Sequence, residues 1–310
     1  MSTKKHAYLL MVHEFTGVLQ ALLKCIDHDS NDIFVHIDRN ADTGMSSVIR
    51  KIVHKSLLIF VPSCRVNWGG YSQIVAEMNL LESATSQDIY EYYHLLSGAD
   101  LPLRPQTDIH RFFEVNLGRE FINFQKRDFE FYERVRYFYF LQDKIKRNDI
   151  SFRNLVYIKL SEFMLFIQRK LGISRNNNIS FQKGANWFSI TDDFARFIVS
   201  KKKWIRKVFR WTYCADELLI QTVYTHFKYE HSLYSADYAD SCESMVRYID
   251  WKRGGPYVFT LNDYDELIGS GMMFARKFSK NVSKEIVDRL CEHILPDCVH
   301  GSKKYKHPLE

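Results

Sequence analysis

Short apolar runs alternate with stretches of helical periodicity over residues 6–115, and this alternation constrains the fold more than any other feature of the chain. An apolar run of this length suits a buried strand, whereas apolar residues three and four apart suit one face of a helix. The strand–helix order predicts a mostly parallel, doubly wound α/β sheet flanked by helices. Strands are expected at 6–12, 33–37, 57–61 and 92–96, and helices at 16–26, 70–83 and 109–115.

Polar residues follow three of the expected strands. His13 comes directly after the first strand, Asp38 after the second, and the turn Ser97–Asp100 after the fourth. Ligands of doubly wound sheets bind at the carboxyl ends of the strands. These positions are therefore candidates for a binding site along one edge of the sheet.

The segment from Lys126 to Asn178 has a different pattern and predicts a helical insertion. It contains no proline and only one glycine, Gly172. Its part 155–171 is strongly apolar and flanked by basic residues, but Lys159 and Glu162 interrupt it too much for a comfortable membrane span. Two interpretations are open for 155–171: a helix in the core, which we favour, and a helix lying in a membrane interface.

The α/β pattern resumes after residue 179. The chain shows no internal repeat and no low-complexity linker, and 310 residues lie at the upper end of what one hydrophobic core serves. We therefore expect a single domain over 1–310, with the helical insertion at about 126–178. Further strands are predicted at 185–190 and 258–260, and further helices at 191–200, 216–226 and 264–268.

Residues 247–278 suggest a ligand. They contain an aromatic residue, Trp251, a basic and glycine-rich turn, KRGGP at 252–256, and the closing sequence FARKF at 274–278. Fixed cations near such a turn suit a diphosphate because they neutralise its charge without a metal ion. An aromatic face nearby suits a sugar ring. The stretch predicts a nucleotide-sugar enzyme.

Glu217 is the candidate general base of such an enzyme. It would take a proton from an acceptor hydroxyl, a role typically worth roughly 10²–10⁴-fold in rate. Glu217 and Asp216 also open a predicted helix, where the macrodipole alone favours acidic residues. The catalytic and the purely structural interpretation are both open for this pair.

Asp263 and Asp265 form an Asp-x-Asp pair of the kind that binds Mn²⁺ or Mg²⁺ in many sugar-nucleotide enzymes. The pair directly precedes a predicted helix, so helix capping explains it better and we expect no metal cofactor. The sequence has no HxxxH or HExxH spacing, no GxGxxG or Walker loop, and no G-x-S-x-G elbow. Dinucleotide, P-loop and α/β-hydrolase chemistry are therefore not expected.

The composition limits the classes of binding partner and the cellular compartment that we expect. A net charge of +6 in short basic runs does not predict nucleic-acid binding, although such runs attract anionic membranes by about 1 kcal/mol per residue. No apolar segment long enough for a signal peptide or membrane anchor begins the sequence, and its six scattered cysteines predict neither a zinc site nor a disulfide framework. We expect a cytoplasmic protein, with peripheral contact at the inner membrane face as a second option.

Four sequence blocks resemble, in order, the core-2/I-branching N-acetylglucosaminyltransferases and the related peptide xylosyltransferases. Together they span most of the chain outside the helical insertion. The blocks are IFVHID at 33–38, VNWGGYSQIVAEMNLL at 66–81 continuing to YYHLLSGADLPL at 92–103, KGANWFS at 183–189 with ADE at 215–217, and FARKF at 274–278.

The resemblance implies a GT-A-like fold and an inverting, metal-independent transfer from a UDP-sugar. N-acetylglucosamine is the commonest donor sugar of the family and xylose is the second. Glu217 matches the catalytic base of the family, Lys277 a diphosphate-binding lysine, and Trp251 an acceptor-side tryptophan. His13 and Asp38 lie at the strand ends that hold the nucleotide in the family. The acceptor would be a glycan or a lipid-linked glycan of a bacterial surface polysaccharide.

The sequence departs from the family pattern at the second diphosphate-binding residue. Relatives have an arginine there, whereas a strict count lands on Gly254, so we take the adjacent Arg253 as the candidate. The animal relatives also carry a membrane anchor and structural disulfides, which this sequence does not suggest, so it resembles a bacterial member. The alternative function is a catalytically silent glycan-binding protein on the same fold, against which the presence of Glu217 and Lys277 argues.

Overall fold

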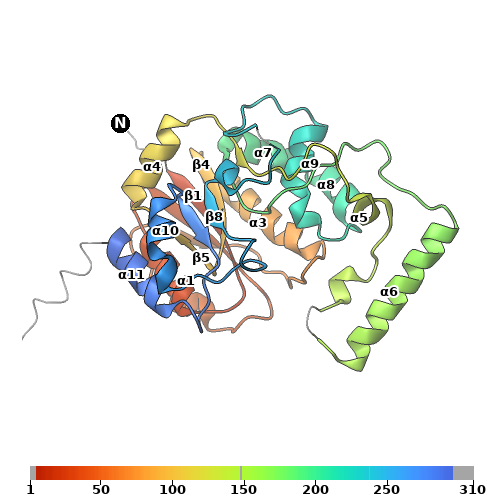
Figure 1. Cartoon of the computed structure of the whole chain (residues 1–310), viewed down its shortest axis with the longest axis horizontal. Coiled ribbons are helices and arrows are strands. Elements are labelled where there is room, and N and C mark those ends of the chain that lie inside the picture. Colours follow the sequence, from red (N-terminus) through yellow and green to blue (C-terminus); the bar gives the residue numbers. More distant parts are fainter. Residues whose placement is uncertain (1–4, 147–148, 237, 296–310) are drawn as a thin grey trace, which may run out of the picture.

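The computed structural model describes residues 5–146, 149–236 and 238–295, and within these ranges six strands form the central sheet (Figure 1). The strand order is β3-β2-β1-β4-β7-β6. The first four of these strands are parallel, whereas β7 runs antiparallel to both β4 and β6. The predicted mostly parallel α/β sheet is confirmed. The strands are β1 His6–Val12, β2 Asn31–Ile37, β3 Leu57–Phe60, β4 Tyr92–Ser97, β6 Phe121–Ile122 and β7 Phe188–Thr191.

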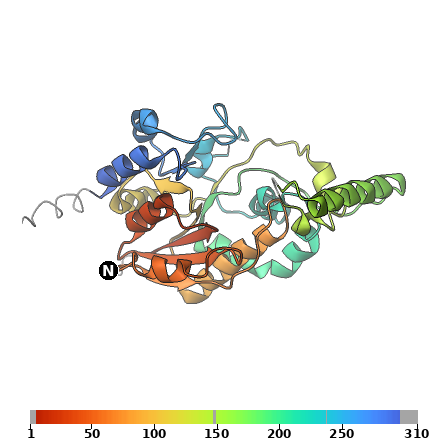
Figure 2. The ribbon, with the colours of Figure 1, turned by 90° about the horizontal axis from the view of Figure 1, so that it is seen from below.

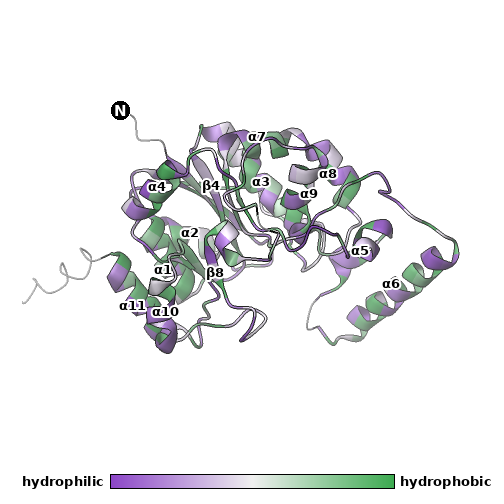
Figure 3. Cartoon of the chain, turned by 45° about the horizontal axis from the view of Figure 1, so that its top comes forward, coloured by the Kyte–Doolittle hydropathy of each residue, from purple (hydrophilic) through white to green (hydrophobic). Residues whose placement is uncertain are grey.

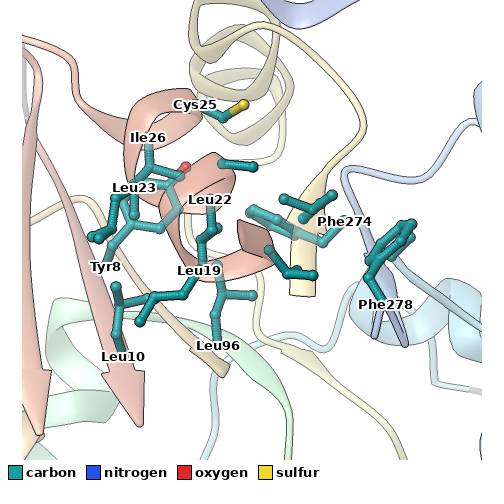
Figure 4. Close-up of a cluster of buried hydrophobic side chains, with 14 of the residues drawn as sticks. Tyr8, Leu10, Leu19, Leu22, Leu23, Cys25, Ile26, Leu96, Phe274 and Phe278 are labelled. Carbon is teal, nitrogen blue, oxygen red and sulfur yellow. The ribbon is translucent and has the colours of Figure 1, made fainter. Parts of the chain in front are cut away.

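Side chains of the central strand β1 alternate between two hydrophobic cores. Tyr8 and Leu10 face the core under α1 and α11, while Ala7 and Leu9 face the core under α3 and α7. Strand side chains alternate with a period of two, so a strand covered on both faces is apolar throughout. Figure 2 shows helices on both faces, and Figure 4 shows part of the first core. These helices are α1 Gly17–Ile26, α3 Ser72–Gln87, α7 Asp192–Ser200 and α11 Lys284–Ile294.

A second, three-stranded sheet brings the C-terminal part of the chain to the end of β4. Strand β9, Phe274–Arg276, lies between β5, Asp100–Pro102, and β8, Arg247–Ile249. The antiparallel register with β5 places Arg276 opposite Asp100. The strand predicted at 258–260 does not form. Phe259 N donates one backbone hydrogen bond to Lys277 O at 3.0 Å, just after β9. The strand that pairs with β9 on this side is β8.

Where the predicted start of a helix is confirmed, a side chain close in sequence fixes it. The hydroxyl of Thr16 accepts a hydrogen bond from Leu19 N at 3.1 Å, and that of Thr191 accepts one from Phe194 N at 3.3 Å, so both threonines are N-caps. The helix predicted at 216–226 is divided into a 3₁₀ turn and a shorter helix. The other helices are α2 Met45–Arg50, α4 Gln106–Val115, α5 Tyr132–Arg136, α6 Phe152–Lys170, α8 Lys202–Phe209, α9 Leu219–His226 and α10 Tyr264–Gly269; the 3₁₀ turns are η1 Gln142–Lys144, η2 Ala215–Glu217, η3 Cys242–Met245 and η4 Leu261–Asp263.

The helix expected at 155–171 forms, but the prediction that it lies in the core is wrong. It forms α6, which projects from the body of the protein (Figures 1 and 2), and its apolar side chains, such as Phe163 and Phe166, are exposed. Its fully buried side chains are polar and include Asn154 and Gln168, while Ile158 and Leu165 on the same side are half-buried. Among the residues described, no helix combines the length and the apolar character that crossing a membrane requires.

Candidate active site

A cavity of about 550 Å³ lies where β1 and β4 end, as expected for the carboxyl edge of a parallel sheet. His13 follows β1 and the turn 97–99 follows β4, and both line the cavity. The continuation of β9, residues 276–281, and the loop before β7, residues 185–187, also line it. The structure thus brings four of the predicted site residues together: His13, Glu217, Trp251 and Lys277.

Glu217 presents its carboxylate to this cavity from the 3₁₀ turn η2. Arg134 Nη1 donates a hydrogen bond to Glu217 Oε2 at 2.8 Å, and Lys183 Nζ lies 3.5 Å from the same oxygen. The side chain retains 37% of its exposure, so solvent and a ligand reach it. Both cations engage Oε2, which fixes the orientation of the carboxylate.

Two glycines fix the position of η2. A Cβ on Gly184 would lie 1.8 Å from the backbone oxygen of Asn123, so no other residue fits there, and Gly184 N donates to Glu217 O at 3.0 Å. Gly69 has a φ of +72° and accepts a hydrogen bond from Cys214 N at 2.9 Å. Through these contacts the segments 66–81, 183–189 and 215–217 meet at one point.

Asp216 precedes Glu217 in the chain, and a glutamine of α3 holds its carboxylate. Gln73 Nε2 donates to Asp216 Oδ2 at 2.8 Å, and Gly69 N donates to Gln73 Oε1 at 2.5 Å. Burial, and then the neighbouring charge of Glu217, raise the pKa of Asp216 to about 6. Glu77, one turn further along α3, is fully buried, and burial together with Asp216 raises its pKa well above the usual range. Of these three carboxyl groups, Glu217 is the one with an ion pair and access to solvent.

Cations line the other part of the cavity. Lys277 and Lys280 follow β9, and Lys280 forms an ion pair with Glu14. Arg276 Nη1 donates to Ser97 Oγ at 2.6 Å and to Asp100 Oδ1 at 2.7 Å. Fixed ammonium and guanidinium groups suit a phosphate or diphosphate ligand. Sequence reasoning gave no role to Arg276 or Lys280, although Arg276 stands beside Lys277 in FARKF.

Three tryptophans line the same cavity. Trp251, predicted from the sequence, is 56% exposed. Trp68 packs edge-on against Tyr213 with ring centroids 6.0 Å apart, and Trp187 carries the Arg276 guanidinium 4.3 Å above its ring. Aromatic faces of this kind suit sugar rings. Trp68 and Trp187 stand in the blocks 66–81 and 183–189, which was the available signal for them.

The family model of the Core-2/I-Branching enzyme matches residues 6–266 of this chain. The chain belongs to the Core-2/I-branching enzyme family. The match begins with β1 and ends within α10, so it covers the sheet, Glu217 and Trp251. FARKF lies beyond its end.

Individual relatives of this Core-2/I-branching enzyme are distant. Xylosyltransferase 2 of Rattus norvegicus is 22% identical over 97% of this chain and 35% of its own length, so the chain spans about a third of that protein. The beta-1,3-galactosyl-O-glycosyl-glycoprotein beta-1,6-N-acetylglucosaminyltransferase of Homo sapiens is 20% identical over 93% of this chain and 69% of its own length. The solved structure of S. aureus TarS is 13% identical and overlaps 36% of this chain and 20% of its own, with a TM-score of 0.26, which is too low to bear on function.

Asp38 of this Core-2/I-branching enzyme does not line the cavity. Its Oδ1 accepts a hydrogen bond from Asn40 N at 2.7 Å, and its Oδ2 accepts one from Val66 N at 3.1 Å. The side chain is 8% exposed. Asp38 therefore shapes the turn after β2 and ties it to the segment that carries Trp68.

Arg253, the expected second diphosphate ligand, also lies outside the cavity lining. Its guanidinium forms ion pairs with Asp250, with Asp263 at 2.7 Å and with Glu266 at 2.8 Å. Three carboxylates already surround this one cation, so it holds the loop to η4 and α10. The structure thus places Arg253 outside the cavity lining, and Arg276 is the arginine that lines the cavity.

The capping interpretation of the Asp-x-Asp pair is confirmed for Asp263. Its Oδ2 accepts hydrogen bonds from Thr260 N at 2.7 Å and from Thr260 Oγ1 at 3.0 Å. The bond from Thr260 N and a reciprocal bond from the Asp263 backbone N–H to the Thr260 side chain form a capping box. Its Oδ1 accepts from Arg253. Both oxygens of Asp263 are thus engaged in local structure, while the absence of a catalytic metal stays a prediction.

Proposed function

We propose that this protein is an inverting, metal-independent glycosyltransferase that moves a sugar from a UDP-sugar to a glycan hydroxyl. One observation carries the proposal. A single cavity is lined by the oriented carboxylate of Glu217 and by the cations that follow β9, Lys277 and Lys280. The family membership and the names of the relatives support the reaction class.

Glu217 acts as the general base in this proposal. Its carboxylate accepts the proton of the acceptor hydroxyl while the acceptor oxygen bonds to the anomeric carbon of the donor. The bond from that carbon to the diphosphate oxygen breaks in the same displacement, with both electrons going to UDP. One displacement inverts the anomeric carbon. The ion pairs with Arg134 and Lys183 hold the carboxylate in position before the reaction.

Fixed cations balance the charge that develops on the departing diphosphate. Lys277 and Lys280 are point charges on one segment, both line the cavity, and Lys280 is paired with Glu14. Arg276 is already engaged by Asp100 and stacked on Trp187, so it serves mainly to position this segment and adds a weaker field. Preorganised charge of this kind stabilises a transition state without a metal ion.

N-acetylglucosamine is the donor sugar that we propose, with xylose as the alternative. Of the two relatives described above, one is named as an N-acetylglucosaminyltransferase and the other as a xylosyltransferase. For the acceptor we propose a glycan of a bacterial surface polysaccharide or its lipid-linked precursor. The tryptophans of the cavity, Trp251 above all, suit the acceptor sugar.

A donor screen followed by a turnover assay tests this proposal. The true donor binds the native protein and raises its apparent unfolding temperature, so UDP-N-acetylglucosamine and UDP-xylose should separate in thermal shift. With the better donor, UDP release should increase when a glycan acceptor is added. Donor and glycan binding without UDP release under any acceptor would instead favour a catalytically silent glycan-binding protein.

A further inference from the structure

Helix α6 turns three buried polar residues toward the body of the protein, beside the half-buried Ile158 and Leu165. Asn154, Ser161 and Gln168 are its buried residues, and they are spaced seven apart, which places them on one face. The Asn154 amide bonds to Lys146 N at 2.9 Å and Lys146 O at 3.0 Å. The Gln168 amide bonds to Phe138 N at 2.7 Å and Phe138 O at 3.0 Å. Specific hydrogen bonds therefore fix which face of α6 points away from the body.

The outward face of α6 is apolar. Phe152 is 82% exposed, Phe163 is 59% exposed and Phe166 is 51% exposed. A surface helix of a globular protein has the reverse arrangement, with its apolar face toward the core. Exposed apolar side chains gathered on one helix, here with Lys159 among them, mark a site of interaction with a protein or a membrane. The hydropathy colouring of Figure 3 shows this helix as an isolated arm, and four more exposed apolar residues lie on it: Leu155, Val156, Leu160 and Ile167.

Positive charge accompanies the apolar face. Glu162 is the single acidic residue of α6, and it pairs with Lys159 at 2.8 Å. Lys159 precedes Phe163 by four residues and Lys170 follows Phe166 by four, so both lysines border the exposed phenylalanines. The helix carries four basic residues, Arg153, Lys159, Arg169 and Lys170.

A polar pocket of about 410 Å³ extends this charge beside the start of α6. Its acidic residues are occupied locally: Asp143 accepts from Ser72 Oγ at 2.8 Å, and Asp149 accepts from Ser151 N at 2.8 Å. An anionic headgroup therefore meets mainly cations there. The basic residues of its lining are Arg65, Lys144, Lys146 and Arg153.

We propose that α6 docks on an anionic lipid surface. The phenylalanines enter the boundary between headgroups and acyl chains, and the bordering lysines and arginines reach the lipid phosphates. Charge complementarity selects this occupant over a second copy of the chain. In a self-associated pair, the excess of basic residues on each α6 would face the same excess on its partner.

The position of α6 connects this surface to the active site. A cavity of about 500 Å³ between α6 and the body is lined by apolar side chains that include Ile158, Leu165 and Tyr213. Trp68 lines this cavity and also the cavity that contains Glu217. Docking of α6 thus places the active site beside the lipid surface. This consequence rests on the proposed function, and it favours a lipid-linked glycan as the acceptor.

Flotation with lipid vesicles tests the docking without any sugar or nucleotide. The wild-type protein should float with vesicles of phosphatidylcholine containing about one quarter phosphatidylglycerol, and bind phosphatidylcholine alone more weakly. The double variant Phe163→Glu/Phe166→Glu should partition about tenfold or more weakly, because two rings leave the interface and two negative charges are added. A matched control is Ile89→Glu/Val115→Glu, which replaces two exposed apolar residues outside α6 and should bind like the wild type.

Unfolding temperature and the size of the protein in solution complete the test. The four exposed positions should tolerate glutamate, so both variants should unfold at the wild-type temperature. Absence of wild-type binding, equal binding to neutral vesicles, or full binding by the α6 variant would overturn the proposal. A wild-type dimer that the α6 variant loses, together with no vesicle binding, would assign the surface to a second copy instead. Sugar transfer to a water-soluble acceptor is a separate measurement, so failure of docking and failure of the proposed function remain distinguishable.

Discussion

Arg134 Nη1 donates a hydrogen bond to Glu217 Oε2 at 2.8 Å, and this contact joins the helical insertion to the candidate base. Arg134 belongs to α5, while Glu217 belongs to η2 on the far side of the insertion in sequence. The insertion therefore contributes a residue to the site. Lys183, 3.5 Å from the same oxygen, provides a second positive charge.

Replacement of Arg134 should slow the reaction while nucleotide binding is kept. Without the guanidinium the carboxylate loses its fixed orientation, so we expect Arg134→Ala to lower kcat by roughly tenfold to a hundredfold. The Kd for UDP should stay at the wild-type value. Arg136→Ala is the matched control, because Arg136 lies in the same helix, is exposed and stacks on Tyr132 at 4.5 Å. Steady-state kinetics and calorimetry measure both quantities, and equal rates for the two variants would refute the positioning role.

The two diphosphate candidates from the sequence should behave differently. Lys277 lines the cavity, so Lys277→Ala should weaken UDP binding by about tenfold to a hundredfold, the usual loss for a hydrogen bond to a charged group. Arg253 is enclosed by Asp250, Asp263 and Glu266, so Arg253→Ala should leave the Kd for UDP unchanged. Calorimetric titration of both variants with UDP decides the matter. Weaker UDP binding in Arg253→Ala would restore the sequence assignment.

The stability of the protein should depend on pH through Asp216. Its pKa is raised to about 6 in the folded state by burial and by Glu217, so the folded protein holds this proton more tightly than the unfolded chain. The stabilisation is complete below the pKa of an unfolded aspartate, about 4, and is lost as the pH rises through the folded value. Asp216→Asn resembles the protonated form. The free energy of unfolding of this variant, relative to that of the wild type, should therefore increase as the pH rises from about 4 to about 7.

Urea unfolding at a series of pH values measures this difference. Gln73 should remain bonded to residue 216 in the variant because an amide oxygen also accepts from Gln73 Nε2. A difference between variant and wild type that is the same at every pH would show that Asp216 has an ordinary pKa in the folded protein.

Removal of divalent ions should leave sugar transfer intact. Fixed cations beside the diphosphate replace a metal in the proposed reaction, and Asp263 is engaged by Thr260 and Arg253. Initial rates with and without EDTA are the measurement. Strict dependence on Mn²⁺ would contradict the account and return Asp263 and Asp265 as metal ligands.

Much of the sheet could be predicted because its strands are buried on both faces. The run at 6–12 is apolar throughout since it packs against helices on either side, and it forms β1 with the predicted bounds. The side chain that fixes the start of a helix is also local in sequence, as at Thr16 and Thr191. These features need no knowledge of distant contacts.

The errors concern contacts between segments that are distant in sequence. Apolar content indicated a core position for α6, whereas its orientation depends on hydrogen bonds between Gln168 and Phe138, 30 residues earlier in the chain, and between Asn154 and Lys146. The spacing of seven between polar residues was the available signal. Likewise, Arg253 and Arg276 stand in the same basic stretch, and only the pairing of β9 with β5 shows that Arg276 reaches the cavity.

The role of Glu217 as the base is the central claim, and Glu217→Gln tests it most directly. The amide keeps the shape of the side chain but cannot take the proton of the acceptor hydroxyl. Transfer to a glycan acceptor should fall by at least about 10²–10⁴-fold, while calorimetry should give the wild-type Kd for UDP. Turnover near the wild-type rate in a variant that still binds UDP would contradict the account.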